Sequence, residues 1–463
     1  MNIKIENIGK INKADINIDG ITVIAGENNT GKSTVGKALF ATFDSLFGYS
    51  DYIEYQKTQY IRQILKDQIK NLDMLLKNIT GTQRGKSGSA IKSIEEYLPK
   101  YIYNSSHNDI KEITKQLCLE HSNRYKLSSK IILEEQQIFE WIESVTENIS
   151  KLFSVEDKSV GNKKITRIFS AIFNKQIIRI PTNDSEPVEN GKIHLNIKEK
   201  ENTLYFSHEK EDVCVENTQT FEVMHRPIFI ESSRAVNNLS RILFPNMSDT
   251  DWIKFLCRPN ISSFYFSSSD NTANNNSESK NNEINDYIII QLEDTLKIIE
   301  EKLHSVIKGK FIKVNNELQF KSEGYSKPFK LSNLSTGLKA FALIQRIIEL
   351  GVLREKDILI FDEPEINLHP EWQLIYAELI IIMQQQLDLT VLITTHSPYF
   401  LNAIEVYTKK YAIDNKCHYY LADEIDGNVQ FNDVTDNTEP IYKKLFTPLQ
   451  KLEDIEYNGE VVE

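Results

Sequence analysis

The chain has 463 residues and an acidic balance, with 66 Asp and Glu against 54 Lys and Arg and a formal net charge of −12. That length suits one large α/β domain with a sizeable core and an inserted subdomain. The charge argues against non-specific nucleic-acid affinity of the molecule as a whole, because phosphate binding needs clustered Lys and Arg. The four cysteines are scattered without metal-ligand spacing, which is typical of a reduced cytoplasmic protein.

The sequence predicts neither a membrane span nor a signal peptide. The longest apolar run, over 374–393, is interrupted by Glu378, three glutamines and Asp388. It is too polar to cross a bilayer, which needs about 20 mostly apolar residues. The first ten residues lack the charged and then apolar pattern of a signal peptide. We therefore expect no membrane partner.

The first 25 residues predict three short strands, over 3–11, 14–18 and 21–25. The third strand runs directly into GENNTGKST, and residues 35–47 follow with helical spacing. A strand, a glycine-rich loop and a helix in this order form the setting of a phosphate-binding loop.

The segment from Gly26 to Ser33 matches the P-loop pattern G-x-x-x-x-G-K-[ST]. Its glycines allow backbone N–H groups to face a phosphate, and the helix N-terminus adds a positive potential. We expect Lys32 to bridge the β- and γ-phosphates of ATP and Ser33 to bind Mg²⁺. The predicted nucleotide-binding residues of this loop are Gly26, Asn28, Asn29, Thr30, Gly31, Lys32, Ser33 and Thr34.

The pattern changes to several helical segments over 49–159, without an unbroken heptad repeat. We expect a compact helical insertion there, which leaves 1–48 and 160–463 as one discontinuous domain. Residues 192–218 alternate like antiparallel strands, whereas the polar stretch 267–283 predicts a disordered surface loop.

Two adjacent acids follow a second apolar strand. Residues 358–361 are all apolar, and Asp362 and Glu363 come directly after them. Nucleotide sites in parallel sheets lie outside the carboxyl ends of the strands. Asp362 therefore suits the Mg²⁺ shell, directly or through water, and Glu363 suits the polarisation of the attacking water. A solvated strand end is the alternative.

Two further segments complete the pattern. The apolar strand 389–395 ends at His396, some 30 residues beyond the acidic pair. Ser335 and Gly337 stand just before an amphipathic helix and 25 to 27 residues before Asp362. A hydroxyl and N–H groups at a helix start can bind an anion, although a serine N-cap is the simpler interpretation of Ser335 alone.

Together these four segments resemble the ABC ATPase superfamily, and more narrowly its soluble branch with RecF, SMC and OLD-like proteins. The resemblance implies an α/β fold, a two-lobed ATPase head in which a mixed sheet with the P-loop joins an antiparallel β lobe. It implies that His396 senses the γ-phosphate and that Glu363 and His396 are the catalytic residues. It also implies a homodimer or higher homo-oligomer, in which Ser335 and Gly337 of one subunit contact the γ-phosphate bound by Lys32 of another.

The chain departs from the family pattern at several positions. The signature reads LSTGL where transporters have LSGGQ, so that Thr336 and Leu338 replace a glycine and a glutamine. His369 stands where SMC proteins have a D-loop aspartate. The Q-loop glutamine cannot be placed, and Gln219 is one of several weak candidates.

The C-terminal third looks most like the ATPase subunits of Septu-type and retron-associated anti-phage defence systems. Such systems pair the ATPase with a separately encoded HNH nuclease, and similar systems use a Toprim nuclease. Only about 60 residues follow Tyr399, without a D-x-D pair, so we expect the nuclease on another chain. The alternative is a DNA-binding repair ATPase of the RecF or SMC kind. Six basic residues without an acid over 158–179 leave nucleic-acid contact open, although a solvated face is the simpler interpretation.

Overall fold

The computed structural model forms two compact units, one of Met1–Phe47 with Ile165–Glu463 and one of Gly48–Lys164. The structure describes residues 1–80, 98–104, 107–122, 135–180, 189–207, 221–231, 293–306, 308–314, 317–425 and 427–458. The expected disordered loop at 267–283 and the Q-loop candidate Gln219 lie outside the described residues.

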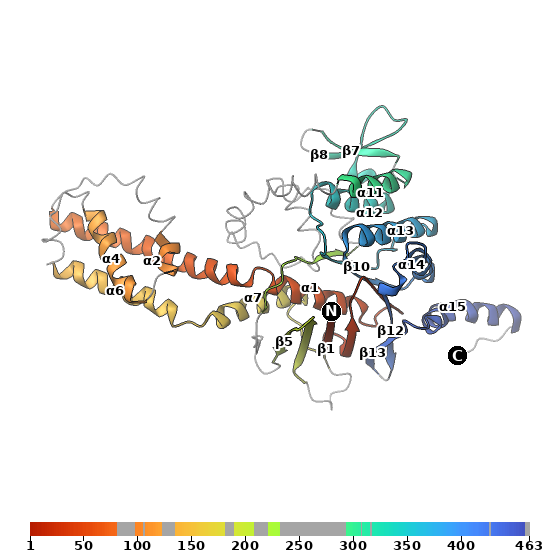
Figure 1. Cartoon of the computed structure of the whole chain (residues 1–463), viewed down its shortest axis with the longest axis horizontal. Coiled ribbons are helices and arrows are strands. Elements are labelled where there is room, and N and C mark those ends of the chain that lie inside the picture. The colour runs from red at the N-terminus through yellow and green to blue at the C-terminus, as the bar shows by residue number, and fades with distance from the viewer. Residues whose placement is uncertain are drawn as a thin grey trace. The chain divides into compact units, whose positions relative to one another are not determined.

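The larger unit contains a sheet of ten strands in the order β5-β4-β1-β2-β13-β12-β3-β11-β10-β6 (Figure 1). Its strands are β1 (Asn2–Ile8), β2 (Ile11–Asn17), β3 (Ile21–Gly26), β4 (Gly191–Ile197), β5 (Lys200–Phe206), β6 (Ile228–Glu231), β10 (Ile358–Asp362), β11 (Thr390–Thr395), β12 (Cys417–Ile425) and β13 (Asn428–Asp433). The strands β12, β3, β11, β10 and β6 pair in parallel, whereas β1 pairs antiparallel with β2 and β4.

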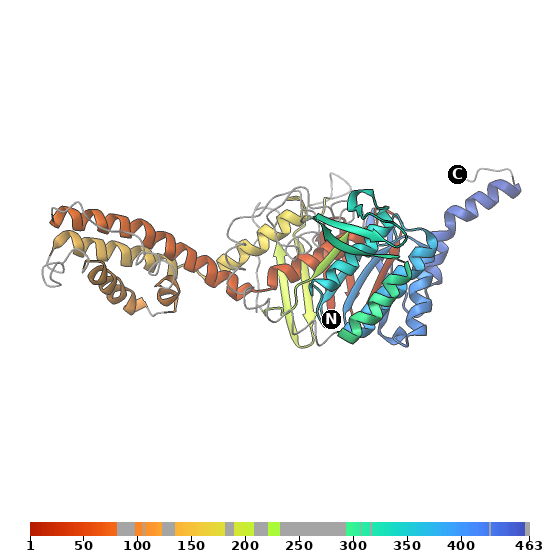
Figure 2. The ribbon, with the colours of Figure 1, turned by 90° about the horizontal axis from the view of Figure 1, so that it is seen from above.

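The parallel strands are apolar because helices cover both of their faces. All residues of β3 and β10 are buried. Val23, Phe361 and Ile393 belong to one core cluster with α12 (Thr336–Glu349), α13 (Pro370–Leu387) and α14 (Pro398–Lys410). On the other face α1 (Lys32–Leu46) packs close, since a Cβ on Gly36 would lie 3.1 Å from Ile360. Figure 2 shows these helices around the sheet.

A second, three-stranded antiparallel sheet consists of β7 (Gly309–Val314), β8 (Glu317–Ser322) and β9 (Phe329–Lys330). The helices α11 (Glu293–Val306) and α15 (Glu439–Asn458) complete the larger unit. The predicted α/β class, with a mixed P-loop sheet and antiparallel strands beside it, is confirmed. The sequence predicts no strand after Tyr399, yet β12 pairs directly with β3.

The smaller unit is helical. Its helices are α2 (Tyr49–Thr80), α4 (His107–Ser122) and α6 (Gln136–Phe153), and α7 (Asp157–Ile172) begins in it. Apolar residues at three- and four-residue intervals, such as Ile61, Leu65 and Ile142, meet in one core cluster. The indole N–H of Trp141 donates to the Gln68 carbonyl at 2.9 Å and ties α6 to α2.

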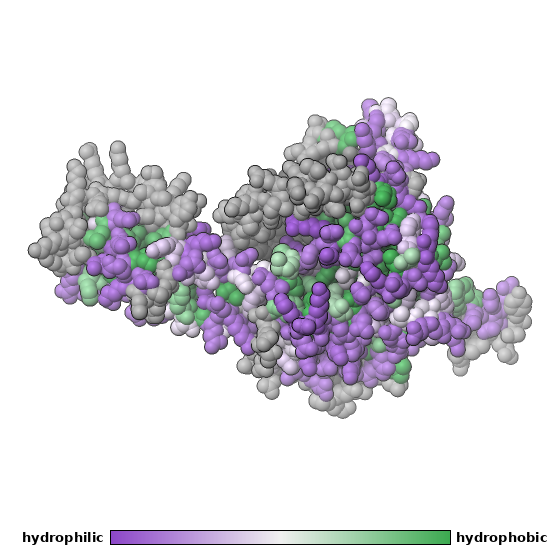
Figure 3. All heavy atoms as spheres, in the orientation of Figure 1, coloured by the Kyte–Doolittle hydropathy of each residue, from purple (hydrophilic) through white to green (hydrophobic). Residues whose placement is uncertain are grey.

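The visible surface of the described residues is mostly hydrophilic, with hydrophobic side chains in separate patches (Figure 3). Among the helices that the structure describes, none combines the length and the apolarity that a bilayer span requires.

A histidine–aspartate pair lies at the amino end of β10, at the opposite end of this strand from the predicted site. His225 Nδ1 is 2.9 Å from Asp357 Oδ1, and the other carboxylate oxygen accepts from the Arg354 N–H at 2.7 Å. The hydrogen bond to Asp357 raises the pKa of His225, although burial and the nearby Arg354 and Lys356 oppose it. Burial raises the pKa of Asp357.

The His225 pair predicts a pH dependence of stability. Because the folded-state pKa of His225 is raised, its contribution is fully present below its ordinary pKa of about 6.5 and is lost as the pH rises through the raised value. We expect the melting temperature of the wild type to fall slightly relative to that of His225→Gln between about pH 6 and pH 8. Gln keeps an amide donor for Asp357 and does not titrate. Identical pH profiles of the two proteins would contradict this assignment.

Candidate active site

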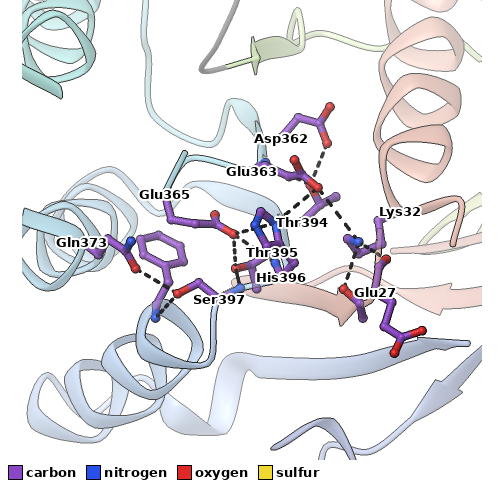
Figure 4. Close-up of polar contacts among 12 residues, drawn as sticks. Glu27, Lys32, Asp362, Glu363, Glu365, Gln373, Thr394, Thr395, His396 and Ser397 are labelled. Atoms are coloured by element: carbon purple, nitrogen blue, oxygen red, sulfur yellow. Dashed lines mark hydrogen bonds and ion pairs between the residues drawn. The ribbon is translucent and has the colours of Figure 1, made fainter. Parts of the chain in front are cut away.

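Four of the predicted site residues, Lys32, Asp362, Glu363 and His396, converge at the carboxyl edge of the parallel strands (Figure 4). The register pairs Thr395 of β11 with Ala25 of β3, and Asp362 of β10 with Thr394 of β11. Three neighbouring strands therefore end at the same level, and the loop after each of them reaches the same space.

The P-loop leads from β3 into α1, and its lysine is buried. Lys32 is 3% exposed, and its Nζ donates to the carbonyls of Gly26 at 3.0 Å and Glu27 at 2.5 Å. Burial lowers the pKa of Lys32, and the carboxylates led by Glu363 oppose that shift. Gly31 precedes α1 with a left-handed φ of 74°, and no side chain caps the helix. The first N–H groups of α1 therefore face the loop, as an anion site requires.

The first glycine of the loop is required by a close backbone approach. A Cβ on Gly26 would lie 2.3 Å from the carbonyl oxygen of Ala422, its partner in β12. The side chains of Asn28 and Asn29 are exposed, and Thr30 is buried with its hydroxyl donating to the Glu27 carbonyl at 2.8 Å. The Thr34 N–H donates to the carbonyl of Gly31 at 3.0 Å, in the first turn of α1.

Asp362 lies beside Ser33 at the foot of the loop. Its Oδ1 accepts a hydrogen bond from the Thr394 hydroxyl at 2.6 Å, and hydrogen bonding by the Ser33 side chain also lowers the pKa of Asp362. Asp362 is 8% exposed, and burial raises its pKa, an effect that these hydrogen bonds and Lys37 oppose. A carboxylate and a hydroxyl that are placed side by side are oxygen ligands of the kind that Mg²⁺ prefers.

Glu363 is the less buried member of the acidic pair, with 23% of its side chain exposed. Its backbone φ of 50° is left-handed, which is uncommon for a residue other than glycine and marks local strain. The N–H of Glu363 donates to the Thr394 carbonyl at 3.1 Å, which holds this turn against β11. The carboxylate lies 4.0 Å from Lys32 Nζ and 3.5 Å from His396 Nδ1. The interaction with His396 lowers the pKa of Glu363, and so does Lys32, against the effect of burial.

A third carboxylate, that of Glu365, holds the backbone of His396 in place. Glu365 is 3% exposed, and its Oε1 accepts from the His396 N–H at 3.0 Å and from the Thr395 hydroxyl at 2.7 Å. The His396 ring places Nδ1 3.4 Å from that same oxygen, without the alignment of a hydrogen bond. The carboxylate of Glu363 raises the pKa of His396 most, and Glu365 adds to it, whereas burial lowers it.

Five residues that support this arrangement were not predicted from the sequence. They are Glu365, Gln373, Thr394, Thr395 and Ser397. The Ser397 hydroxyl donates to Gln373 Oε1 at 2.9 Å and caps α14 by accepting from the Phe400 N–H at 3.2 Å. The polar run TTHS after the apolar part of β11 was the available signal, because buried hydroxyls at a strand end need partners.

Ser335 and Gly337 lie on a different element. Ser335 is the exposed N-cap of α12 and accepts from the Leu338 N–H at 3.3 Å. Gly337 is buried against α13, where a Cβ would lie 2.9 Å from the Trp372 ring. These contacts are with α12 itself and with α13. In this chain Ser335 and Gly337 are thus not among the residues that cluster around Lys32.

Among known protein families, a model described as an AAA ATPase domain matches residues 1–401. No curated protein matches the sequence.

Solved structures share low similarity with the chain. The SmcHead bound to the C-winged helix domain of ScpA has 10% sequence identity and a TM-score of 0.43, over 93% of this chain and 97% of that chain. The SMC head domain from Thermotoga maritima has 10% identity and a TM-score of 0.35, over 94% and 98%. The Smc head domain with a coiled coil and joint derived from Pyrococcus yayanosii has 12% identity and a TM-score of 0.35, over 97% and 99%. None of these scores is high enough to carry an inference about function.

The family model extends from the first strand through the P-loop and the acidic pair to α14, which is most of the chain. The chain belongs to the AAA ATPase domain family and is an ATPase.

Proposed function

We propose that the P-loop holds the phosphates of ATP, that Asp362 and Ser33 hold Mg²⁺, and that Glu363 and His396 carry out hydrolysis. The supporting observation is the convergence of Lys32, Asp362, Glu363 and His396 at one sheet edge, where the Glu363 carboxylate lies 4.0 Å from Lys32 Nζ and 3.5 Å from His396 Nδ1. Phosphoryl transfer asks mainly for positioning and charge stabilisation, and these residues supply both.

The residues fit a magnesium ion. Burial raises the pKa of Asp362, so a cation beside its carboxylate would favour the charged form. Ser33 supplies a hydroxyl next to it. When bound, Mg²⁺ would neutralise charge on the phosphate oxygens.

Each remaining side chain has a distinct proposed task. Lys32 turns its ammonium from the loop carbonyls to the phosphates, a short movement from its observed position. Glu363 keeps a lowered pKa and therefore stays charged at neutral pH, as a group that orients and polarises water must. His396 is oriented by Glu365 and places its ring beside the Glu363 carboxylate.

We also propose that two copies trap the nucleotide between them, with Ser335 and Gly337 of one copy facing the P-loop of the other. The exposed hydroxyl at the N-terminus of α12 supports this, since helix N-termini favour anions.

The variant Ser335→Arg tests the dimer. An arginine at this exposed cap fits within the monomer but would fill the space that the partner's nucleotide needs. We expect ATP affinity close to wild type and turnover lower by about 10-fold or more, as for loss of a transition-state contact. Ser335→Ala removes the hydroxyl, and with it a cap of about 1 kcal/mol, without adding bulk, so it separates loss of the hydroxyl from obstruction of the partner's nucleotide. Normal turnover by Ser335→Arg would exclude the signature role.

In its narrower form, the proposal is that the ATPase controls a separate nuclease in anti-phage defence, as a sensor or scaffold. It rests on the resemblance of the C-terminal third to Septu-type and retron-associated ATPases, with an HNH partner favoured over a Toprim one. Co-expression with an HNH nuclease, if a neighbouring gene encodes one, tests this. Cleavage of DNA that depends on both chains and is lost with Lys32→Ala would support the proposal. Cleavage that is indifferent to ATP would refute it.

A second candidate function, nucleic-acid binding by the chain itself, is favoured by the outer face of the sheet β7–β9. The register sets Lys310 opposite Lys321, and Lys330 opposite Gln319 on the same face. Phe320 and Phe329 occupy the other face and pack on the core. Like charges directly opposite each other destabilise a sheet, and a bound anionic partner would offset this repulsion.

Charge reversal separates the two candidates. We expect Lys310→Glu with Lys321→Glu to weaken binding of a labelled DNA duplex and to reduce the salt slope by about two. Lys192→Glu with Lys200→Glu, on the β4–β5 hairpin, is the matched control. Unchanged DNA affinity in the first double variant would remove this face as a nucleic-acid site.

A further inference from the structure

The C-terminal helix α15 contacts the P-loop through one side chain. Lys444 Nζ lies 2.9 Å from Asp423 Oδ1 and 3.9 Å from Glu27 Oε2. Asp423 follows Ala422, whose backbone pairs with Gly26 at the start of the loop. Ile441, one turn before Lys444, is fully buried and anchors this part of α15 to the core.

Glu27 is both a structural and an electrostatic element of the loop. Its backbone carbonyl accepts hydrogen bonds from Lys32 Nζ at 2.5 Å and from the Thr30 hydroxyl at 2.8 Å. Its carboxylate is an anion in the first variable position of a loop that binds phosphates. A bound nucleoside triphosphate would bring several negative charges to this loop, and an uncompensated Glu27 would repel them.

The charge of Glu27 also acts on Lys32, but the Lys32 ammonium donates to the backbone carbonyls of Gly26 and Glu27, whereas the Glu27 carboxylate forms its ion pair with Lys444. Lys10, in the turn between β1 and β2, donates a hydrogen bond to the Asn29 side chain instead. The hydrogen bond to Asp423 raises the pKa of Lys444 most, and the charge of Glu27 raises it further, so this lysine stays charged. Asp423 thus fixes the ammonium in place, and the ammonium faces the Glu27 carboxylate.

We propose that Lys444 is a positioning residue for nucleotide binding, which offsets part of the charge of Glu27 and holds its carboxylate away from the phosphates. The C-terminal helix is then part of the nucleotide site, although it comes more than 400 residues after the P-loop. This inference rests on the proposed role of the P-loop in holding ATP.

The test measures the dissociation constant of a non-hydrolysable ATP analogue with the full chain. We expect Lys444→Ala to raise it by about 5-fold at low salt, since the pair is partly exposed, and by less at about 1 M salt. At saturating ATP the kcat stays at the wild-type value, because Lys444 does not touch the reacting atoms. Lys443→Ala, which removes an exposed charge from the adjacent position, is the matched control.

A second variant separates an electrostatic role from a merely structural one. Glu27→Gln removes the charge that Lys444 compensates, so Lys444→Ala in the Glu27→Gln background should bind the analogue within about 2-fold of Glu27→Gln alone. If the full loss persists in that background, Lys444 acts through Asp423 and the fold, and the proposal is wrong. Unchanged affinity of Lys444→Ala also overturns it.

Lys32→Ala distinguishes this failure from failure of the site itself. Loss of binding in Lys32→Ala with normal binding in Lys444→Ala refutes only the role of Lys444. Normal binding in both variants refutes the phosphate site.

Discussion

Glu363→Gln should lower the kcat of ATP hydrolysis by about 100- to 10,000-fold, the range that general-base groups contribute, with little loss of ATP affinity. The reason is geometric. Glu363 is the acid that the left-handed turn after β10 directs toward Lys32 and His396, and its lowered pKa keeps it charged. Gln retains the shape and an amide in place of the carboxylate, so binding contacts persist while the charge that polarises water is lost.

The measurement is steady-state phosphate release, together with the mass of the ATP-bound species in solution. If two copies close on the nucleotide, the slow variant should accumulate the ATP-bound dimer, whereas the wild type passes through it. Glu371→Gln, an exposed residue in the first turn of α13, is the matched control and should hydrolyse ATP normally. A wild-type rate for Glu363→Gln would show that Glu363 is not the catalytic base.

The parts of the site that could be predicted from sequence are those that are local in the chain. An apolar strand followed by polar residues places Asp362 and His396 at strand ends, because parallel strands bury their whole length. The P-loop needs only eight consecutive residues and the strand before it. Nothing beyond the neighbouring positions was required to place Lys32 at the start of α1.

The parts that could not be predicted depend on pairing between distant segments. Cys417–Ile425 has a strand-like composition. However, no feature of the neighbouring sequence indicates that it pairs with β3, or that the Ala422 backbone packs against Gly26. In the sequence, Glu365 is simply the last acid of DEPE. Only the fold brings its carboxylate to the backbone N–H of His396, 31 residues further along. The same holds for Lys444, which reaches the P-loop from the last helix.

Lys32→Met should weaken ATP binding by about 100-fold, because charge-assisted hydrogen bonds to phosphates contribute about 1.5–3 kcal/mol each. Lys32 is the buried cation of the loop, and its ammonium lies 4.0 Å from the Glu363 carboxylate. Met keeps the length of the apolar stem and removes only the charge. The variant therefore tests the ammonium rather than the packing of α1.

Two observations separate lost binding from lost folding. The carbonyls of Gly26 and Glu27 lose their donor in Lys32→Met, so a modest fall in melting temperature is expected and does not count against the assignment. Added ATP with Mg²⁺ should raise the melting temperature of the wild type, since a ligand that binds only the folded state stabilises it, and should not raise that of the variant. A variant that binds ATP with wild-type affinity would place the phosphates elsewhere, and the roles proposed for Ser33 and Asp362 would fall with that of Lys32.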